Sequence, residues 1–183
     1  MKKLLSAVLA LALLLCCVSA FAESEIVPTF RFVTVIPEGY EAVDETWTDP
    51  FIVAQTIKPV AEGKPAIMTV VSYNDAFSDI TFNADMAEDE FKARAEELAF
   101  DEENGQKLPY EVKETGLGTK VIVISYPDSY TEFYSIWHGY EVSLFAVNFD
   151  KEYNATPLTE EQVAMIMQFL TDMDFSAIIQ EAE

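Results

Sequence analysis

Short segments in which apolar and polar residues alternate recur along the chain, and this alternation is typical of β-strands with one buried face. The first three segments cover residues 30–36, 51–57 and 66–73. Pro37-Glu38-Gly39 follows the first segment, and a second turn sequence at residues 61–65 precedes the third. Proline fixes φ and glycine accepts positive φ, so both sequences favour a reversal of the chain. The pattern predicts a meander of three strands.

Apolar residues then recur at helical spacing before the next strands begin. The apolar stripe of this predicted helix consists of Ala87, Phe91, Ala95 and Leu98. Asn83 or Asp85 is placed to cap the helix, and Asp85 with Glu88 predicts a capping box. Asn104-Gly105 marks the end of the helical segment, because glycine interrupts a helix. We therefore expect one helix after the third strand.

Alternation returns in four further segments, residues 110–115, 120–126, 130–137 and 140–149. His138-Gly139 joins the last two, and a two-residue joint that ends in glycine is typical of a tight hairpin. With this turn, the period of two assigns alternate residues to opposite faces of the sheet. One face of the predicted hairpin carries Phe133, Ser135, Trp137, Tyr140, Val142 and Leu144, which we interpret as core.

The last element has the clearest helix signals in the chain. Thr159 is the expected N-cap, and Gln162 closes a capping box with it. The buried stripe consists of Val163, Ile166, Met167 and Leu170. The order of elements is thus three strands, a helix, four strands and a helix. This order predicts an α+β fold, with an antiparallel sheet of about seven strands flanked by two main helices.

The chain begins with the three parts of a secretory signal peptide. Lys2 and Lys3 form a basic start, an uncharged run rich in leucine and alanine follows, and Ala20 and Ala22 suit a cleavage site. Cleavage after Ala22 gives a signal peptide at residues 1–22 and a single α+β domain at residues 23–183. We expect the core of that domain at about residues 28–175, followed by a short C-terminal tail. A short, leucine-rich signal peptide is typical of bacteria, so we expect a secreted or extracytoplasmic protein.

Two other interpretations of the first residues stay open. The apolar run could remain as a membrane anchor, because its length approaches the roughly 20 residues of a spanning helix. Cys16 or Cys17 could instead carry a lipid, although Leu15 is larger than the residue that such a site prefers. Cleavage after Ala22 removes both cysteines, so the mature chain has neither a thiol nor a disulfide.

Cleavage also changes the charge of the chain. It removes two of the 11 basic residues and none of the 32 acidic ones, which leaves a formal charge of −23. Such a charge repels nucleic acid and anionic lipid, and it favours solubility, cationic partners or loosely held divalent cations. We therefore expect no nucleic-acid partner, no stable membrane insertion after cleavage, and a monomeric domain.

The second face of the predicted hairpin mixes aromatic residues with carboxylates. It carries Glu132, Tyr134, Ile136, Glu141, Ser143 and Phe145. One interpretation is structural: a helix covers this face, and Glu132 and Glu141 lie at its solvent margin. The other is a shallow binding surface at Glu132, Tyr134 and Glu141, suited to a peptide, a sugar or a cationic ligand. These three residues form the candidate binding site.

The sequence contains few groups suited to catalysis or metal binding. His138 is the only histidine, and its place in the turn favours a backbone role over acid–base chemistry. A zinc site would have one histidine and only carboxylates, and the acidic clusters at residues 88–90 and 101–103 lack the spacing of a calcium loop. We therefore expect no catalytic residue, no metal site and no cofactor. A carboxylate pair for glycoside hydrolysis remains an alternative, because such residues meet only in space.

Segments at both ends of the domain are similar in sequence to a known family. Phe30-Arg31-Phe32 leads to Ile36-Pro37-Glu38-Gly39-Tyr40, and Phe175 follows the closing helix at residues 159–173. In these segments and in its order of elements, the mature chain resembles the PsbP-like fold family, which includes uncharacterised bacterial exported proteins. The resemblance implies an antiparallel sheet between helices and a binding or accessory role without catalysis. Neither a functional residue nor photosynthetic function transfers, since we find no family binding motif at matched positions.

Together these features predict an exported, non-enzymatic binding or accessory protein. It would act outside the cytoplasm through contact with a protein, a peptide or a glycan. Two alternatives stay open, a hydrolase that uses carboxylates and a calcium-dependent surface adhesion module.

Overall fold

The computed structural model describes residues 30–31, 36–43, 47–49, 52–102, 104–127, 129–152, 154–173 and 179–180. The predicted signal peptide, with Ala20 and Ala22, lies outside the described residues.

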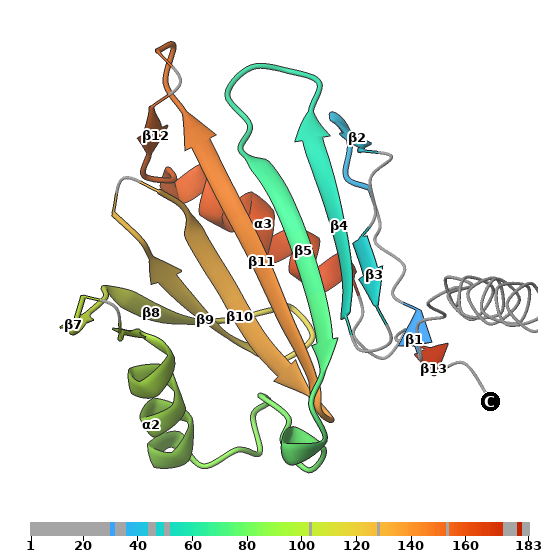
Figure 1. The fold of residues 1–183 in the computed structure, drawn as a ribbon, viewed down its shortest axis with the longest axis vertical. Coiled ribbons are helices and arrows are strands. Elements are labelled where there is room, and N and C mark those ends of the chain that lie inside the picture. Colours follow the sequence, from blue (N-terminus) through green and yellow to red (C-terminus); the bar gives the residue numbers. More distant parts are fainter. Residues whose placement is uncertain are drawn as a thin grey trace, which may run out of the picture.

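Most strands of the protein belong to one antiparallel sheet (Figure 1). In space they follow the order β2 (Tyr40–Ala42), β4 (Ile52–Pro59), β5 (Ala66–Tyr73), β11 (Tyr140–Phe149), β10 (Thr131–Trp137), β9 (Lys120–Ser125) and β8 (Tyr110–Glu114). The short strands β3 (Trp47–Asp49) and β12 (Ala155–Thr156) pair with β4 and β11. The expected α+β class, with a large antiparallel sheet and two helices, is confirmed.

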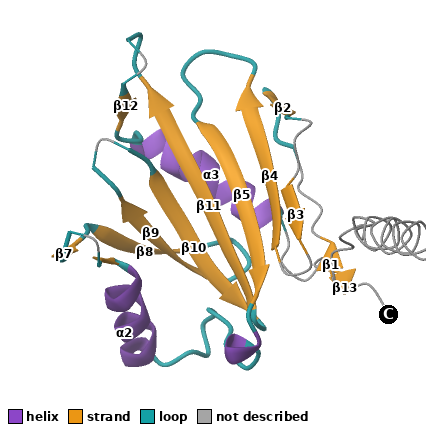
Figure 2. Ribbon diagram, in the orientation of Figure 1, coloured by secondary structure: helices purple, strands orange, loops and turns teal. Residues whose placement is uncertain are grey.

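The two helices pack on opposite faces of this sheet, and each covers its own hydrophobic cluster. Helix α3 (Glu160–Asp172) lies across the sheet (Figure 2) and buries Ile166, Phe169 and Leu170 against the central strands. Helix α2 (Glu88–Leu98) buries Phe91 and Ala95 against residues of β9 and β10. Apolar spacing of three and four residues therefore produces a buried stripe on each helix. The stripes differ in part from the predicted ones, because Ala87 is exposed before α2 and the buried Phe169 of α3 was not predicted.

The capping box of α3 is present as predicted. The Thr159 hydroxyl accepts from the backbone N–H of Gln162 at 3.2 Å, and the Gln162 side chain accepts from the backbone N–H of Thr159 at 2.9 Å. The Gln162 amide also donates to the carbonyl of Gly63 at 2.9 Å and to the side-chain oxygen of Asn148 at 3.2 Å. Gln162 thus joins the start of α3 to the β4–β5 turn and to β11.

The predicted cap of α2 is wrong. The helix begins at Glu88, and its N-cap Ala87 makes no side-chain hydrogen bond. Asn83 instead accepts from the backbone N–H of Asp85 at 3.0 Å, so its side chain closes a turn before the helix. The acidic first turn, Glu88-Asp89-Glu90, interacts favourably with the positive end of the helix dipole in place of a cap.

The first predicted strand does not have the expected partner. Among its described residues, β1 (Phe30–Arg31) forms, and it pairs with β13 (Ile179–Gln180) in a separate two-stranded sheet. Residues 32–35 lie outside the described residues, and Ile36 belongs to no strand. After the turn at Gly39, which has a φ of 82°, β2 joins the main sheet instead. Strand β13 lies in the segment that we assigned to the C-terminal tail.

Several small elements were not predicted. Besides β2, β3, β12 and β13, they are the 3₁₀ helix η1 (Asp75–Phe77) and the paired strands β6 (Phe100–Asp101) and β7 (Gln106–Lys107). Strands of two residues carry no readable alternation, so their pairing depends on the chain around them.

The hairpin of β10 and β11 has the predicted register. Trp137 lies opposite Tyr140, and Phe133 lies opposite Leu144. His138 and Gly139 form the turn with φ values of 46° and 84°, the left-handed conformation that a two-residue hairpin turn requires.

Candidate binding site on strands β10 and β11

The three candidate residues lie on adjacent central strands, on the face of the sheet that α2 shares. Glu132 and Tyr134 belong to β10 and Glu141 to β11, and the register places Tyr134 opposite Ser143 and Glu141 opposite Ile136. Glu132 and Glu141 are half-buried, whereas Tyr134 is only 5% exposed. The hairpin therefore brings the two carboxylates to one face but sets the tyrosine ring below them.

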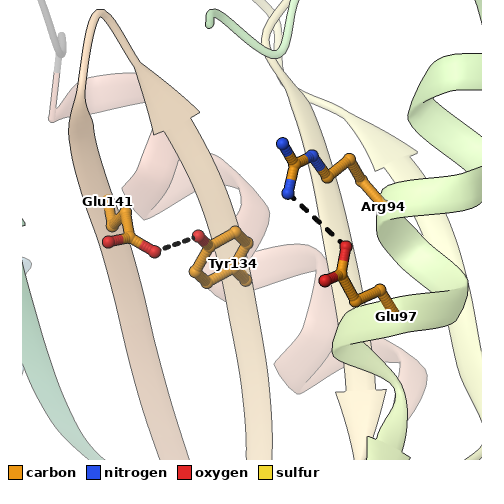
Figure 3. A network of polar contacts seen from close by, with 4 residues as sticks. All are labelled: Arg94, Glu97, Tyr134 and Glu141. Carbon is orange, nitrogen blue, oxygen red and sulfur yellow. Dashed lines mark hydrogen bonds and ion pairs between the residues drawn. The ribbon is translucent and has the colours of Figure 1, made fainter. Parts of the chain in front are cut away.

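The Tyr134 hydroxyl forms a hydrogen bond with the carboxylate of Glu141. The hydroxyl donates to one carboxylate oxygen of Glu141 at 2.5 Å (Figure 3), and the Asn74 amide donates to the other at 3.3 Å. Burial raises the pKa of Tyr134, so the hydroxyl keeps its proton at neutral pH and remains a donor. The ring itself packs in the cluster under α2 with Phe82 and Phe91. Tyr134 thus positions Glu141 and does not present an exposed ring to a ligand.

Glu132 is held by a second set of neutral donors. Its two carboxylate oxygens accept from the Ser143 hydroxyl at 2.9 Å and from the Tyr126 hydroxyl at 3.3 Å. The Tyr126 ring stacks on Tyr130 with a centroid distance of 4.3 Å, and Tyr130 meets the edge of Phe145 at 5.5 Å. Burial raises the pKa of Glu132, and the two hydrogen bonds oppose that shift only in part.

Within the described part of the chain, no lysine or arginine lies at ion-pair distance from Glu132 or Glu141. Arg94 extends from α2 toward the sheet (Figure 3), but its ion pair joins it to Glu97 at 3.4 Å. An ionised carboxylate whose partners are neutral donors has no countercharge, so it attracts a cation.

Apolar side chains lie beside the two carboxylates on the same face of the sheet. The register aligns Met68 of β5 with Phe145 of β11, and Phe145 with Glu132. Met68 is 41% exposed, and Val70 and Phe145 are half-buried. We refer to Glu132, Glu141, Met68, Val70 and Phe145 as the acidic sheet face.

The two glutamates occupy separate positions along the hairpin. Glu132 lies opposite Phe145, which is four residues along β11 from Glu141. Four residues of extended strand correspond to roughly 13 Å between backbone positions. Tyr134 and Ser143 form the pair midway between these positions, and their hydroxyls bond to Glu141 and Glu132 respectively. Both carboxylates therefore turn toward the middle of the face.

The remaining sequence candidates do not join this face into a catalytic or metal-binding arrangement. His138 is exposed, and its φ of 46° fits a turn residue. No three histidine, cysteine, aspartate or glutamate side chains among the described residues come together in a way that could hold a metal ion. The interactions available at the acidic sheet face are hydrogen bonding, charge attraction and apolar contact.

Several residues of the site were not predicted from the sequence. Tyr126 and Tyr130 flank the loop before β10, and only the fold shows that they stack beside Glu132. Both also line a cleft of about 860 Å³ between α3 and the outer strands. Asn74 caps η1, and its second role at Glu141 has no local signal. The place of Ser143 opposite Tyr134 did follow from the register of the hairpin.

Neither a protein family nor a curated protein nor a solved structure matches the chain. None of the helices that the structure describes is long and apolar enough to cross a membrane.

Proposed function

We propose that the chain is the precursor of an exported binding or accessory protein whose recognition site is the acidic sheet face. Its partner is an extracytoplasmic peptide or protein segment that carries basic side chains around an apolar centre. The observation that carries this proposal is that, among the described residues, the groups that donate hydrogen bonds to Glu132 and Glu141 are all neutral. A lysine or arginine from a partner would supply the missing positive charge.

The spacing of the face narrows the choice among the expected partner classes. A peptide in an extended conformation places residues i and i+4 on one side, roughly 13 Å apart. Two basic residues at this spacing would reach Glu132 and Glu141, and the residue between them would lie over Ser143 and Val70. A neutral glycan offers hydroxyl groups but no positive charge, so its attraction to the two carboxylates is weaker than that of a basic peptide.

A designed peptide tests this arrangement directly. The probe is acetyl-Lys-Thr-Leu-Thr-Lys-amide, titrated against residues 23–183 by NMR at near-physiological salt. We expect amide shifts to cluster on β5, β10 and β11. The isomer with both lysines at one end has the same charge but the wrong spacing, and we expect it to bind several-fold more weakly. A neutral oligosaccharide serves as the glycan probe.

Matched variants separate a local contact from the general negative charge. Glu132→Gln combined with Glu141→Gln removes two charges at the face, and Glu62→Gln combined with Glu152→Gln removes two at exposed positions elsewhere. We expect about tenfold weaker binding for the first pair, which corresponds to about 1.4 kcal/mol, and little change for the second. Equal losses in both pairs, or tighter binding of the oligosaccharide, would overturn the proposal.

Export and family membership belong to the same proposal. The three-part signal peptide at residues 1–22 supports secretion, with cleavage after Ala22. The antiparallel sheet between two helices, the turn at Pro37-Glu38-Gly39 and the closing helix α3 support a PsbP-like fold. Mass spectrometry of the protein from a bacterial envelope or culture medium would test the export step, since an N-terminus other than Glu23 contradicts the assigned cleavage site.

A further inference from the structure

Strand β8 forms one edge of the main sheet, beside α2 (Figure 1). Its ladder with β9 is bounded by two hydrogen bonds of 2.9 Å, from Ser125 N–H to the Pro109 carbonyl and from Thr115 N–H to the Thr119 carbonyl. In an antiparallel pair, bonded residues alternate with residues whose backbone groups point away. The N–H and C=O groups of Tyr110, Val112 and Glu114 therefore point away from β9, and β8 pairs with no other described strand.

Two hollows flank this edge on opposite faces of the sheet. On the face of α3, the cleft of about 860 Å³ is lined by Glu111 and Lys113 of β8 and by Val163 and Met167 of α3. On the face of α2, a hollow of about 720 Å³ is lined by Tyr110 and Val112 of β8, by Phe91 and Lys92 of α2, and by Lys120. Tyr110 packs against the cluster that α2 covers, whereas Val112 is 50% exposed.

We propose that β8 binds an extended peptide as an additional antiparallel strand, and that this peptide carries an acidic side chain between two apolar ones. A strand added to an edge gains main-chain hydrogen bonds, and its alternate side chains reach opposite faces. Here those side chains would enter the two hollows in turn. The residue opposite Val112 enters the hollow beside α2, and its two neighbours enter the cleft beside α3.

The charges in the two hollows define the chemistry of the peptide. The Lys120 ammonium donates to the carbonyl of Met86 at 3.3 Å and lies 5.3 Å from the centre of the Phe91 ring. No described carboxylate lies at ion-pair distance from Lys120. Lys92 and Glu88 line the same hollow, so its lining carries two positive charges and one negative charge. In the cleft beside α3, Lys113 is already paired with Glu111 at 2.8 Å. An acidic side chain thus fits beside α2, and apolar side chains fit against Val163 and Met167.

This surface is separate from the acidic sheet face and selects the opposite charge. The probe is acetyl-Thr-Leu-Glu-Leu-Thr-amide, titrated by calorimetry against residues 23–183 at about 150 mM salt, where the Debye length is about 8 Å. We expect Lys120→Gln to weaken binding of this peptide about tenfold and to leave its glutamine analogue unchanged. Lys151→Gln, an equal charge change in an exposed loop, should have no effect.

Backbone substitutions test the added strand itself. The Val112 N–H points away from β9, so Val112→Pro removes one outward donor without breaking the β8–β9 ladder. We expect it to abolish binding while the melting temperature of the domain stays close to that of the wild type. Methylation of the peptide's glutamate nitrogen should also abolish binding, whereas methylation of the following leucine nitrogen, which points away from β8, should be tolerated.

Several results would overturn the proposal. They are no binding at about 2 mM peptide, equal effects of the two methylations, or an unchanged affinity in Lys120→Gln. Self-association of the free protein that Val112→Pro abolishes would instead make a second copy the occupant of this edge. Because the two peptide probes have opposite charge and respond to different variants, failure here leaves the test of the acidic sheet face intact.

Discussion

Glu132 loses hydration when the chain folds, and Ser143 and Tyr126 return only two neutral hydrogen bonds. Burial raises the pKa of this carboxyl above its ordinary value of 4.5. A group whose pKa is raised in the folded state contributes stability that is complete below its unfolded pKa and lost as the pH rises through the folded pKa. Glu132 is therefore a residue whose charge weakens the fold at neutral pH, which is common at binding sites.

A pH series with Glu132→Gln measures this effect. The glutamine keeps the shape of the side chain but cannot ionise, so the variant should gain stability relative to the wild type as the pH rises from about 4 to 7. Urea unfolding at each pH gives the two free energies of unfolding. Glu62→Gln, at an exposed turn, is the control and should show no such trend. A difference between wild type and Glu132→Gln that stays constant with pH would contradict the assignment.

The turn residue His138 allows a second test at the residue scale. Its φ of 46° lies in the left-handed region, which costs an L-residue about 1–2 kcal/mol but is tolerated by asparagine. We expect His138→Asn to unfold at the same urea concentration as the wild type, and the β-branched variant His138→Val to lose about 1–2 kcal/mol. Equal stability of the two variants would show that the backbone does not select the residue at this position.

Gly139, the second residue of the same turn, tolerates a side chain less well than position 138. A Cβ atom there would lie 2.8 Å from the Tyr73 ring and 3.2 Å from the backbone oxygen of Asn74. The closest atom belongs to a ring that already packs on Tyr140 with a centroid distance of 5.0 Å, so it has little room to move. Replacement of Gly139 by alanine therefore adds a steric cost to the strain of its φ of 84°.

At the scale of elements, the accuracy of the sequence prediction depended on how local each signal was. The start of α3 and the β10–β11 turn were predicted because Thr159-to-Gln162 and His138-Gly139 each define an element within a few residues. The start of α2 was missed because Asn83 bonds to its own loop. The partner of β1 was missed because Ile179–Gln180 lies at the far end of the chain.

The same distinction between local and distant signals applies to the candidate site. The register of one hairpin was enough to place Glu132 and Glu141 on one face, because a two-residue turn fixes which side chains share a face. The burial of Tyr134 under α2 and the bond from Asn74 depend on segments that approach from elsewhere in the chain. Hydrophobic periodicity records that a position is buried but not which element covers it.

The start of α3 supports a prediction that compares two residues of one capping box. Thr159→Ala removes one cap bond and should cost about 1 kcal/mol. Gln162→Ala removes the other cap bond and also leaves the Gly63 carbonyl and the Asn148 side chain without this donor, so it should cost about 2–4 kcal/mol. Urea unfolding of both variants and of the double variant measures this. The double variant should lose less than the sum, since each single change already breaks the box. Equal losses in the two single variants would contradict the role assigned to Gln162.

At the scale of the whole molecule, residues 23–183 carry a formal charge of −23, which acts on every part of the fold. Self-repulsion of a strongly charged chain favours expansion, and salt screens it. The Debye length falls from about 30 Å to about 10 Å between 10 and 100 mM salt. We therefore expect the melting temperature to rise by several degrees over this range of sodium chloride.

The same reasoning separates screening from specific calcium binding. Calcium sites use six to eight oxygen ligands, and no group of three carboxylate or histidine side chains among the described residues could hold a metal ion. At about 5 mM, calcium chloride and magnesium chloride should therefore raise the melting temperature equally, because both act only through diffuse attraction to the acidic surface. Differential scanning fluorimetry on residues 23–183 with the two salts in parallel measures this. A rise of several degrees with calcium alone would contradict the prediction and favour calcium-dependent adhesion over a face that recognises basic peptides.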